Sequence, residues 1–455
     1  MEHLTPRKIA EITGGEYIGD EPSADVRVAG AARDDHDVKP GNLFVCIRGA
    51  RADGHDFANT AFTSGAACCL AERVLQDAQG PYVLVNSTLE AIKTIGKYYR
   101  SLFDIPVIGV TGSVGKTTTK EMTAAALGSK FRVLKTQENL NNELGVPLTL
   151  LSLDERHEAA VIEMGVSDFG EMSRLAEIVR PDICIMTKIG YSHIETFGDL
   201  NGVLRAKSEV FSFMNPDGAA ILNGDDELLK KYDPGIRKIT FGLEPHNDYR
   251  AENIRAEGTN AVIFNIAGHM ELFNVRIPAY GTHLAAAALA ASAAGRQLGM
   301  TNDEISRGLM SYKPVEGRAN VKSTGFITLI DDCYNSNPNS VMAALESLSS
   351  LPGRRIAILG DMFELGDISE QMHREVGIFA AVSGINSLIC CGDNAVFIYE
   401  GYISAGGGDP WFFTSKQELN TALSELINKG DAVLIKASHG MKFEELLPAL
   451  TSLAV

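Results

Sequence analysis

The chain has 455 residues, of which 45% are hydrophobic and 22% are charged, values typical of a soluble protein with roughly two to four domains. Its formal net charge of −17 argues against nucleic acid as a main partner, because no basic stretch offsets the repulsion. We also expect no membrane insertion, because the longest apolar run, near Leu284–Gly295, is much shorter than the roughly 20 residues that cross a bilayer.

The cysteines and the N-terminus indicate the cellular compartment. There are seven cysteines, an odd number, with no C-x-x-C spacing, and most of them lie in apolar runs such as LICCG. The first residues, MEHLTPRKIAEITGG, contain no apolar signal core. We therefore expect reduced core cysteines in a cytoplasmic protein, rather than disulfides or a zinc site. We also expect a monomer.

Residues 1 to about 100 combine short strand and helix patterns. VKPGNLFVCIRG, for example, is a Pro-Gly turn followed by a half-buried strand pattern. This part of the chain contains no phosphate-binding loop. We predict a small separate α/β domain over residues 1–101.

The pattern changes from Ile105 onwards. PVIGVTG predicts an apolar strand that ends in glycines, and KTTTKEMTAAALGSKF after it has helical character. Further apolar strands are predicted at AAVIEMG, DICIMTKIG and GAAILNGDD, with helix-like stretches between them. This alternation predicts a central domain, residues 102–314, whose parallel sheet is covered on both faces and binds ligands beyond the carboxyl ends of its strands.

The segment KPVEGR, residues 313–318, is typical of a hinge. A second series of strands follows it, at FITLIDDCYNSNP, RRIAILGDM, NSLICCG and DAVLIKASHG. This series predicts a Rossmann-like α/β domain over residues 315–455. The predicted fold class is therefore α/β with three domains.

The segment GSVGKTT, residues 112–118, lies between a predicted strand and a predicted helix. Glycines let the backbone wrap a phosphate, so that successive N–H groups and the helix N-terminus point at the anion. The match to G-x-x-x-x-G-K-[ST] is imperfect, because Val110 stands where the first glycine belongs. The flanking strand and helix nevertheless favour nucleotide binding over a structural turn. The predicted nucleotide-binding residues of this loop are Gly112, Ser113, Gly115, Lys116, Thr117 and Thr118.

Charged and polar side chains follow other predicted strands. Glu163 ends the strand AAVIEMG, where a carboxylate can hold Mg²⁺ beside a phosphate loop or simply cap a helix. His193 follows DICIMTKIG, and a lone histidine is more often structural than a ligand. Asp331 and Asp332 end FITLIDD, where the polar residues after them can reach a nucleotide or form an Asx-rich turn.

Several of these stretches together resemble the Mur ligases of peptidoglycan synthesis. The resemblance covers nearly the whole chain, and it includes TGSVGKTTTKEM, ENLNNELGVPLTLL, HIETFG, AKSEVF, DDCYNSNPNSVMAAL, LGDMFELG and KASHGMKFEEL. The DDxYNxNP and LGDMxELG patterns resemble the branch of this family that adds D-alanyl-D-alanine to UDP-N-acetylmuramoyl-tripeptide. The resemblance implies a first domain that binds the UDP-sugar-peptide, a middle domain that binds ATP and a third domain that closes over the nucleotide.

The resemblance also implies roles for individual residues. Lys116 and Arg318 would contact the ATP phosphates, and the metal ligands for two Mg²⁺ ions would be Thr117, Glu163, His193 and Lys207. Lys207 matches a lysine that the family often carbamylates, which needs a neutral amine. The implied catalytic residues are Lys116, Lys207, His193 and Arg318. The other implied nucleotide contacts are Asn139, Asp332, Tyr334 and Asn337, and the implied uridine-nucleotide region comprises Arg33 and the stretch 49–55, with Gly49, Asp53 and His55.

The sequence departs from the family pattern mainly at the expected adenine end of the site. The family's H-N-x-x-N reads His283-Leu284-Ala285-Ala286-Ala287 here, so both asparagines are missing. Two alternatives therefore stay open beside the main one. The first is a related Mur-type or folylpolyglutamate-type ligase with another acid or amine substrate, and the second is a non-catalytic protein that senses nucleotides.

Overall fold

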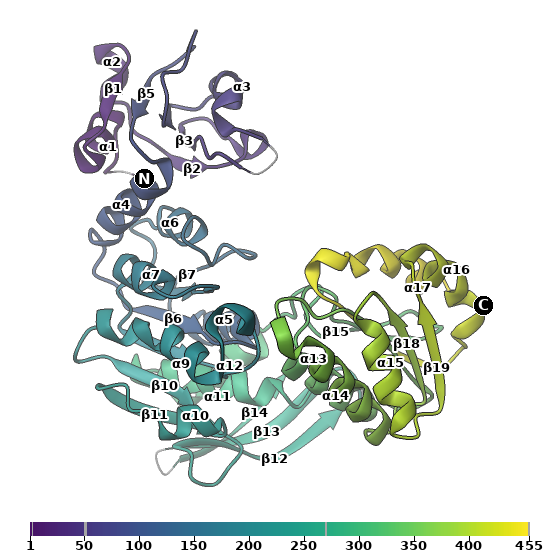
Figure 1. The fold of residues 1–455 in the computed structure, drawn as a ribbon. Helices are drawn as coiled ribbons and strands as arrows, with labels where there is room; N and C mark the ends of the chain where they lie inside the picture. The colour runs from purple at the N-terminus through teal and green to yellow at the C-terminus, as the bar shows by residue number, and fades with distance from the viewer. Residues whose placement is uncertain (2, 50–51, 269–270, 454–455) are drawn as a thin grey trace.

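The computed structural model describes residues 1, 3–49, 52–268 and 271–453, and Figure 1 shows that they form three bodies, each built on its own sheet. The first body is purple, the middle body is teal and the third body is green to yellow. Within these residues, no helix has both the length and the apolar composition needed to cross a membrane. The three sheets confirm the predicted α/β class with three units.

The first body contains a five-stranded sheet in the order β1-β5-β4-β3-β2. Only β1 runs antiparallel to its neighbour. Its strands are β1 (Glu16–Ile18), β2 (Gly30–Ala32), β3 (Asn42–Val45), β4 (Cys68–Ala71) and β5 (Tyr82–Leu84). Its helices are α1 (Pro6–Thr13), α2 (Glu21–Ala24), α3 (Ala58–Thr63) and the 3-10 turns η1 (Asp35–Asp37) and η2 (Gly54–Phe57).

Helix α4 (Thr88–Arg100) lies inside the predicted first domain but packs on the middle body. The hydroxyl of Tyr99 donates to the carbonyl of Leu153 at 2.8 Å, and Lys97 pairs with Glu177 at 2.5 Å. The helix is amphipathic and buries Ile92 and Ile95, so it needs an apolar surface to cover, and the middle body provides one. Helix α4 is therefore the connection between the two bodies.

The middle body contains a nine-stranded sheet in the order β14-β13-β12-β11-β10-β9-β6-β8-β7. In the order of the sheet, the seven strands from β12 to β7 pair with one another in parallel, as predicted. The parallel strands are β6 (Val107–Thr111), β7 (Val133–Lys135), β8 (Ala159–Glu163), β9 (Ile183–Met186), β10 (Ala219–Asn223), β11 (Arg237–Gly242) and β12 (Tyr249–Glu257).

Two antiparallel strands, β13 (Ala261–Gly268) and β14 (Glu271–Ile277), extend this sheet and were not anticipated. Only three residues separate β12 from β13, and such a short connection allows a hairpin but no crossover. The prediction of a parallel sheet is therefore confirmed from β7 to β12 but does not extend to this edge.

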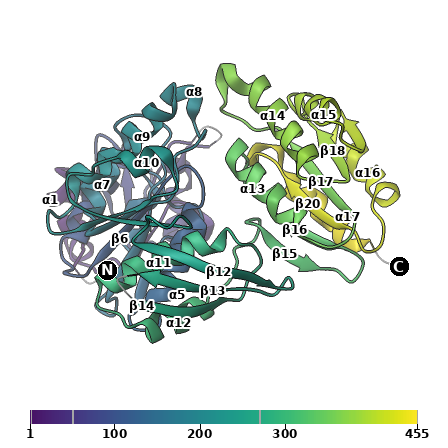
Figure 2. The same ribbon diagram turned by 90° about the horizontal axis from the view of Figure 1, so that it is seen from below.

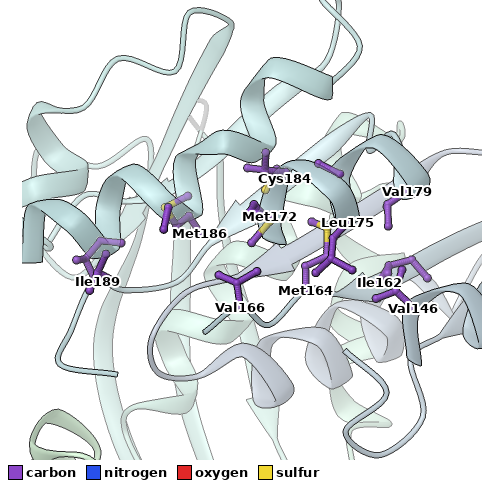
Figure 3. Packing of buried hydrophobic residues seen from close by; sticks show 14 of the residues in the cluster. Val146, Ile162, Met164, Val166, Met172, Leu175, Val179, Cys184, Met186 and Ile189 are labelled. Carbon is purple, nitrogen blue, oxygen red and sulfur yellow. The ribbon is translucent and has the colours of Figure 1, made fainter. Parts of the chain in front are cut away.

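Helices cover both faces of the middle sheet (Figure 2). Figure 3 shows one of these layers, in which Ile162 of β8 and Cys184 of β9 pack against Leu175 of α7. All three side chains are fully buried, and burying a large aliphatic side chain contributes about 1.5–3 kcal/mol. The helices are α5 (Lys116–Leu127), α6 (Gly145–Leu150), α7 (Glu171–Val179), α8 (Ile194–Phe197), α9 (Leu200–Ser208), η3 (Glu209–Phe213), α10 (Glu227–Lys231), α11 (Leu284–Gln297) and α12 (Asn302–Met310).

The third body contains a six-stranded sheet in the order β15-β16-β20-β17-β18-β19. Apart from β15, its strands are parallel, which confirms the predicted Rossmann-like arrangement. The strands are β15 (Asn320–Ser323), β16 (Thr328–Asp331), β17 (Arg355–Gly360), β18 (Ser387–Cys391), β19 (Asp409–Phe413) and β20 (Ala432–Lys436). The helices are α13 (Pro338–Ser349), η4 (Gly366–Ile368), α14 (Ser369–Val382), α15 (Ala395–Ser404), α16 (Lys416–Leu426), η5 (His439–Met441), η6 (Phe443–Leu446) and α17 (Leu447–Ser452).

The start of α13 is fixed by its local sequence. Asn337 is the N-cap residue, and its side chain accepts a hydrogen bond from the Ser340 N–H at 2.9 Å. Pro338 occupies the first helical position, where a missing N–H costs nothing. These residues fix the direction in which the chain leaves β16, and they place the NSNP turn against the middle body.

Candidate active site

A cavity of about 720 Å³ lies where the three bodies meet, and its size is typical of a small-molecule site. The first body contributes Ile47 to its wall, and Leu89 of α4 lies beside it. The middle body contributes residues 113–118 and the carboxyl end of β8, and the third body contributes the turn after β16. Predicted site residues that line this cavity are Ser113, Gly115, Lys116, Thr117, Thr118, Asn139, Glu163, His193, Arg318, Asp332, Tyr334 and Asn337.

The loop from Gly112 to Gly115 joins β6 to α5 and has the conformation that a phosphate loop needs. Gly112 has φ +139°, and a Cβ there would lie 2.0 Å from the Thr187 hydroxyl, so only glycine fits. Gly115, with φ +84°, forms the N-terminal cap of α5. The Ser113 hydroxyl donates to the Gly190 carbonyl at 3.0 Å, which ties the loop to the chain after β9.

Lys116, the first residue of α5, folds back over this loop, because its Nζ donates to the Gly112 carbonyl at 2.8 Å. Burial lowers the pKa of Lys116, and nearby Arg318 lowers it further, whereas Glu163 opposes the shift. An anion bound in the loop would favour the charged amine and offset the cost of burying it. Lys116 is therefore well placed to bind phosphate.

Glu163 ends β8 and is only 1% exposed. Its Oε1 accepts hydrogen bonds from Asn141 Nδ2 at 2.8 Å and from the Thr117 hydroxyl at 3.3 Å. Its Oε2 is buried and has no hydrogen-bond partner within the part of the chain that the structure describes. A buried carboxylate oxygen without a partner is costly unless a cation compensates it. Together with the Thr117 hydroxyl, this oxygen fits the oxygen ligands that Mg²⁺ prefers.

Lys207 lies in α9 and is 1% exposed. Burial lowers the pKa of Lys207 well below its usual range, Lys116 nearby lowers it further, and Glu171 opposes both. Over the described ranges, its amine makes no hydrogen bond or ion pair. The surroundings of Lys207 therefore favour its neutral form, and its amine lies close enough to Lys116 to be affected by that charge, although Lys207 does not itself line the cavity.

The third body brings a second group of charges to the cavity. The Arg318 guanidinium stacks on the Tyr334 ring at 3.8 Å, which holds this cation at the cavity wall. Asp332 Oδ1 accepts from the Ala319 N–H at 3.0 Å, and its Oδ2 accepts from Lys436 Nζ at 2.6 Å. Lys436 is buried and ends β20 beside β16, so the sheet itself positions this ion pair.

Family models for the Mur ligase family cover most of the chain. They match the family's catalytic domain at residues 34–100, its middle domain at 110–295 and its glutamate ligase domain at 317–439. The UDP-N-acetylmuramoyl-tripeptide--D-alanyl-D-alanine ligase of Bacillus subtilis (strain 168) is 37% identical over 458 residues, covering 99% of both chains. The chain belongs to the Mur ligase family.

Two solved structures are similar to this Mur ligase over nearly its full length. One is MurF from Acinetobacter baumannii, with 29% identity, a TM-score of 0.89 and 98% of each chain covered. The other is a MurF ligase from Thermotoga maritima in complex with ADP, with 29% identity and a TM-score of 0.83, covering 94% of this chain and 98% of that one.

Two side chains that were predicted to contact ligands make hydrogen bonds to other residues of this Mur ligase. Both atoms of the Asn337 side-chain amide are engaged, since Oδ1 caps α13 and Nδ2 donates to the Ser192 hydroxyl at 3.0 Å. His55 is buried, with Nδ1 on Asp53 Oδ1 at 2.5 Å and Nε2 accepting from the Glu72 N–H at 2.8 Å. These hydrogen bonds shape the loops that contain the two side chains, and Asn337 also lines the cavity.

The predicted uridine region lies in the first body, away from the lining of the cavity. Arg33 and Gly49 are exposed there, and Asp53 caps η2. A hydrogen bond from His55 is the main reason that the pKa of Asp53 lies below its usual range. Residues 50 and 51 of the predicted stretch 49–55 lie outside the described residues.

Three lining residues were not singled out from the sequence. Asn141 holds Glu163, Lys436 holds Asp332, and His283 faces the same pair of charges. Burial lowers the pKa of His283, Asp332 opposes the shift and Lys436 adds to it. Lys436 could have been found from the rule that strand ends carry ligands, because it ends the strand in DAVLIK.

The buried amine of Lys207 should make the fold less stable at neutral pH. The folded state lowers its pKa, so the unfolded chain binds more protons, and stability rises with pH between the lowered and the usual value. We expect Lys207→Met to raise the free energy of unfolding by about 1 kcal/mol or more at about pH 7, with a smaller gain at about pH 9. Urea denaturation in CO₂-free buffer measures both values.

The exposed Lys231→Met serves as the control for this experiment and should leave stability nearly unchanged. A Lys207→Met variant that is less stable than the parent at neutral pH, or whose advantage grows with pH, would contradict a lowered pKa for the buried Lys207 amine.

Proposed function

We propose that this Mur ligase uses ATP to join D-alanyl-D-alanine to UDP-N-acetylmuramoyl-tripeptide, a step of peptidoglycan precursor synthesis. The observation that carries the proposal is the full-length similarity to enzymes of this activity, combined with a phosphate loop, a buried metal-type carboxylate and the cations Lys116 and Arg318 around one cavity. The proposed domains are residues 1–101 for the UDP-sugar-peptide, 102–314 for ATP, and 315–455 for closure over ATP and for the incoming dipeptide.

The chemistry requires activation of a carboxylate, which is a poor electrophile in water. Transfer of the γ-phosphoryl group from ATP to the tripeptide carboxylate forms an acyl phosphate and releases ADP. The amine of D-alanyl-D-alanine then attacks the acyl carbon, the amide bond forms, and phosphate leaves. Water must stay out, because it would hydrolyse the acyl phosphate.

The phosphate end of the cavity supplies the groups that this transfer needs. Lys116 would bind the transferring phosphoryl group from the middle body, and Arg318 would approach it from the third body. Thr117, Glu163, His193 and Lys207 would hold two Mg²⁺ ions. When bound, Mg²⁺ would neutralise phosphate charge. The unpartnered Oε2 of Glu163 supports the metal assignment.

We propose that Lys207 acts as a carbamate. In the reaction with CO₂, the lone pair of the neutral amine forms a bond to carbon and the nitrogen loses a proton to water. The product is an anion that can bind a cation. Burial and nearby Lys116 lower the pKa of Lys207, which favours the neutral amine that this reaction needs. Isotopic labelling with ¹³CO₂ followed by NMR should give a carbamate signal that Lys207→Met lacks.

The nucleoside end of the site is proposed from position. Asp332 would accept hydrogen bonds from the ATP ribose, and Lys436 donates to its Oδ2 and would hold the carboxylate in place. Asn139 and Tyr334 would lie against the nucleotide, because both line the cavity. Arg33, Gly49, Asp53 and His55 would form or support the uridine-nucleotide site. We also propose a cytoplasmic monomer, and the seven free, buried cysteines support a reducing compartment.

A product-identified turnover assay tests the function. The enzyme is supplied with ATP, Mg²⁺, D-alanyl-D-alanine and UDP-N-acetylmuramoyl-tripeptide carrying either lysine or diaminopimelate, and mass spectrometry identifies the product. We expect ADP release only when both acid and amine are present. ADP release that requires another acid or amine would assign the chain to a different ligase reaction, and nucleotide binding without turnover on any pair would indicate a sensor.

A further inference from the structure

The third body contacts three consecutive residues of the loop between β9 and α8. Asn339 Oδ1 accepts from the Tyr191 N–H at 3.3 Å, and Asn337 Nδ2 donates to the Ser192 hydroxyl at 3.0 Å. His193 Nδ1 pairs with Glu364 Oε2 at 2.6 Å. In Figure 2, α8 lies on the edge of the middle body that faces the third body. This loop is therefore one of the places where the third body docks on the middle body, and Tyr280, which donates to the Ser347 carbonyl at 3.0 Å, is another.

Glu364 lies in the turn that follows β17, and it engages the start of α8 twice. Its side chain pairs with His193, and its carbonyl accepts from the Glu195 N–H at 3.4 Å. Both His193, with φ +55°, and Glu364, with φ +62°, adopt left-handed backbone conformations that non-glycine residues rarely use. Such conformations persist where the surrounding contacts hold them, and they cluster at functional sites.

The pairing leaves one nitrogen of His193 for another partner. A carboxylate accepts hydrogen bonds, so we assign the ring proton to Nδ1, which leaves the lone pair on Nε2. No hydrogen bond to Nε2 is found among the residues that the structure covers. His193 lines the same cavity as Thr117 and Glu163. Histidines that bind metals generally donate their other ring N–H to a carboxylate, a backbone carbonyl or water, which fixes the tautomer and the orientation of the ring.

We propose that Glu364 is a positioning residue for the metal site, holding His193 so that Nε2 faces a divalent cation in the cavity. The inference rests on the proposed function, which makes His193 a metal ligand. Because Glu364 comes from the third body and the proposed metal ligands come from the middle body, docking of the third body fixes the orientation of the ligand His193. Docking and metal binding are therefore coupled, and each should favour the other.

The test measures Mn²⁺ binding directly. The full-length enzyme is titrated with Mn²⁺ in the presence of a non-hydrolysable ATP analogue, and bound ions are counted by electron paramagnetic resonance. In Glu364→Ala we expect the weaker of two Mn²⁺ sites to lose affinity by about 10–100-fold, as is usual for loss of such a supporting carboxylate. The site formed by Thr117 and Glu163 should be unchanged. Glu364→Gln should lose less, because its amide oxygen can still accept from Nδ1.

Asp367→Asn is the matched control. Asp367 lies in the same turn, is exposed, and makes no ion pair in the described structure, so its variant should bind both ions like the parent. Glu364 is also largely exposed, with a side-chain accessibility of 58%, so its variants should fold, and thermal unfolding checks this.

The outcomes separate this proposal from the proposed function. Unchanged binding of both ions in Glu364→Ala would overturn the positioning role, and tighter binding would overturn it too, because Glu364 would then compete with metal for His193. If the parent enzyme itself bound nucleotide but no second ion, the assignment of His193 as a metal ligand would fail instead. A fall in kcat that extra Mn²⁺ partly restores in Glu364→Ala, but not in Lys116→Ala, would support the proposal.

Discussion

Replacing Lys116 with alanine should lower kcat by about 10³-fold or more while the protein stays folded. The amine folds over the phosphate loop and lies next to Arg318 and Glu163, so its removal takes away a cation aimed at the transferring phosphoryl group. Loss of one such preorganised group costs about 10²–10³-fold, and loss of a charged one costs up to about 10⁵-fold. ADP release in a coupled assay, with the product identified by mass spectrometry, measures the effect.

Stability should not fall in this variant. Burial lowers the pKa of Lys116, so the folded protein bears a cost for that amine when no anion is bound, and alanine removes the cost. The control is Lys231→Ala, which changes an exposed lysine in α10 and should retain full turnover. Near-normal ADP release in Lys116→Ala would contradict the assignment of the loop as the catalytic phosphate site.

We expect the Glu163→Gln substitution to weaken the use of Mg²⁺ and to raise the stability of the nucleotide-free protein. Glutamine keeps the shape and the oxygen that accepts from Asn141, but it replaces Oε2 with an amide nitrogen that cannot bind a cation. We expect the Mg²⁺ concentration for half-maximal turnover to rise by at least about 10²-fold, because even supporting residues of metal sites are worth about 10–100-fold. A Mg²⁺ titration of kcat measures this change.

The nucleotide-free Glu163→Gln variant should unfold at higher urea concentration, with a gain of about 1 kcal/mol. The physical reason is that a neutral amide without a partner costs less when buried than a charged oxygen without one. Glu155→Gln, at an exposed position after α6, is the control and should change neither property. If Glu163→Gln needed no more Mg²⁺ than the parent, Glu163 would not be a metal ligand. If the variant were less stable, the conclusion that Oε2 is buried without a partner would be wrong.

The sequence was most informative about elements whose signals are local. The glycines of residues 112–118 require a tight turn between strand and helix, and the structure has φ +139° at Gly112 and φ +84° at Gly115. Glu163 was predicted at the end of a strand, and parallel pairing with β6 brings it to the phosphate loop, because carboxyl ends of parallel strands meet at one edge. Apolar strands alternating with helix-like stretches likewise predicted the parallel sheets of the middle and third bodies.

Structural features that depend on contacts between distant segments could not be predicted from the sequence. The hairpin edge β13–β14 was not anticipated, and α4 packs on the middle body although it precedes that body in the chain. Asn337, predicted to contact nucleotide, lines the cavity, but its side chain also binds Ser192, 145 residues away, which the local sequence does not indicate. Each of these outcomes depends on which surfaces are free when the bodies come together, and a linear pattern does not encode that.

The sequence by itself determined that this protein has three α/β units and a phosphate loop, because glycine geometry and the periodicity of buried strands are properties of short segments. It also placed Lys116, Thr117 and Glu163 at strand and helix ends that face one edge. Only the tertiary structure decided that Lys207 is buried with a lowered pKa, and that one oxygen of Glu163 has no hydrogen-bond partner among the described residues. It also decided that Glu364 holds His193 from another body. Buried side chains, buried polar atoms without a hydrogen-bond partner and contacts between bodies arise only when segments distant in the sequence pack together and exclude water. They are therefore properties of the folded chain.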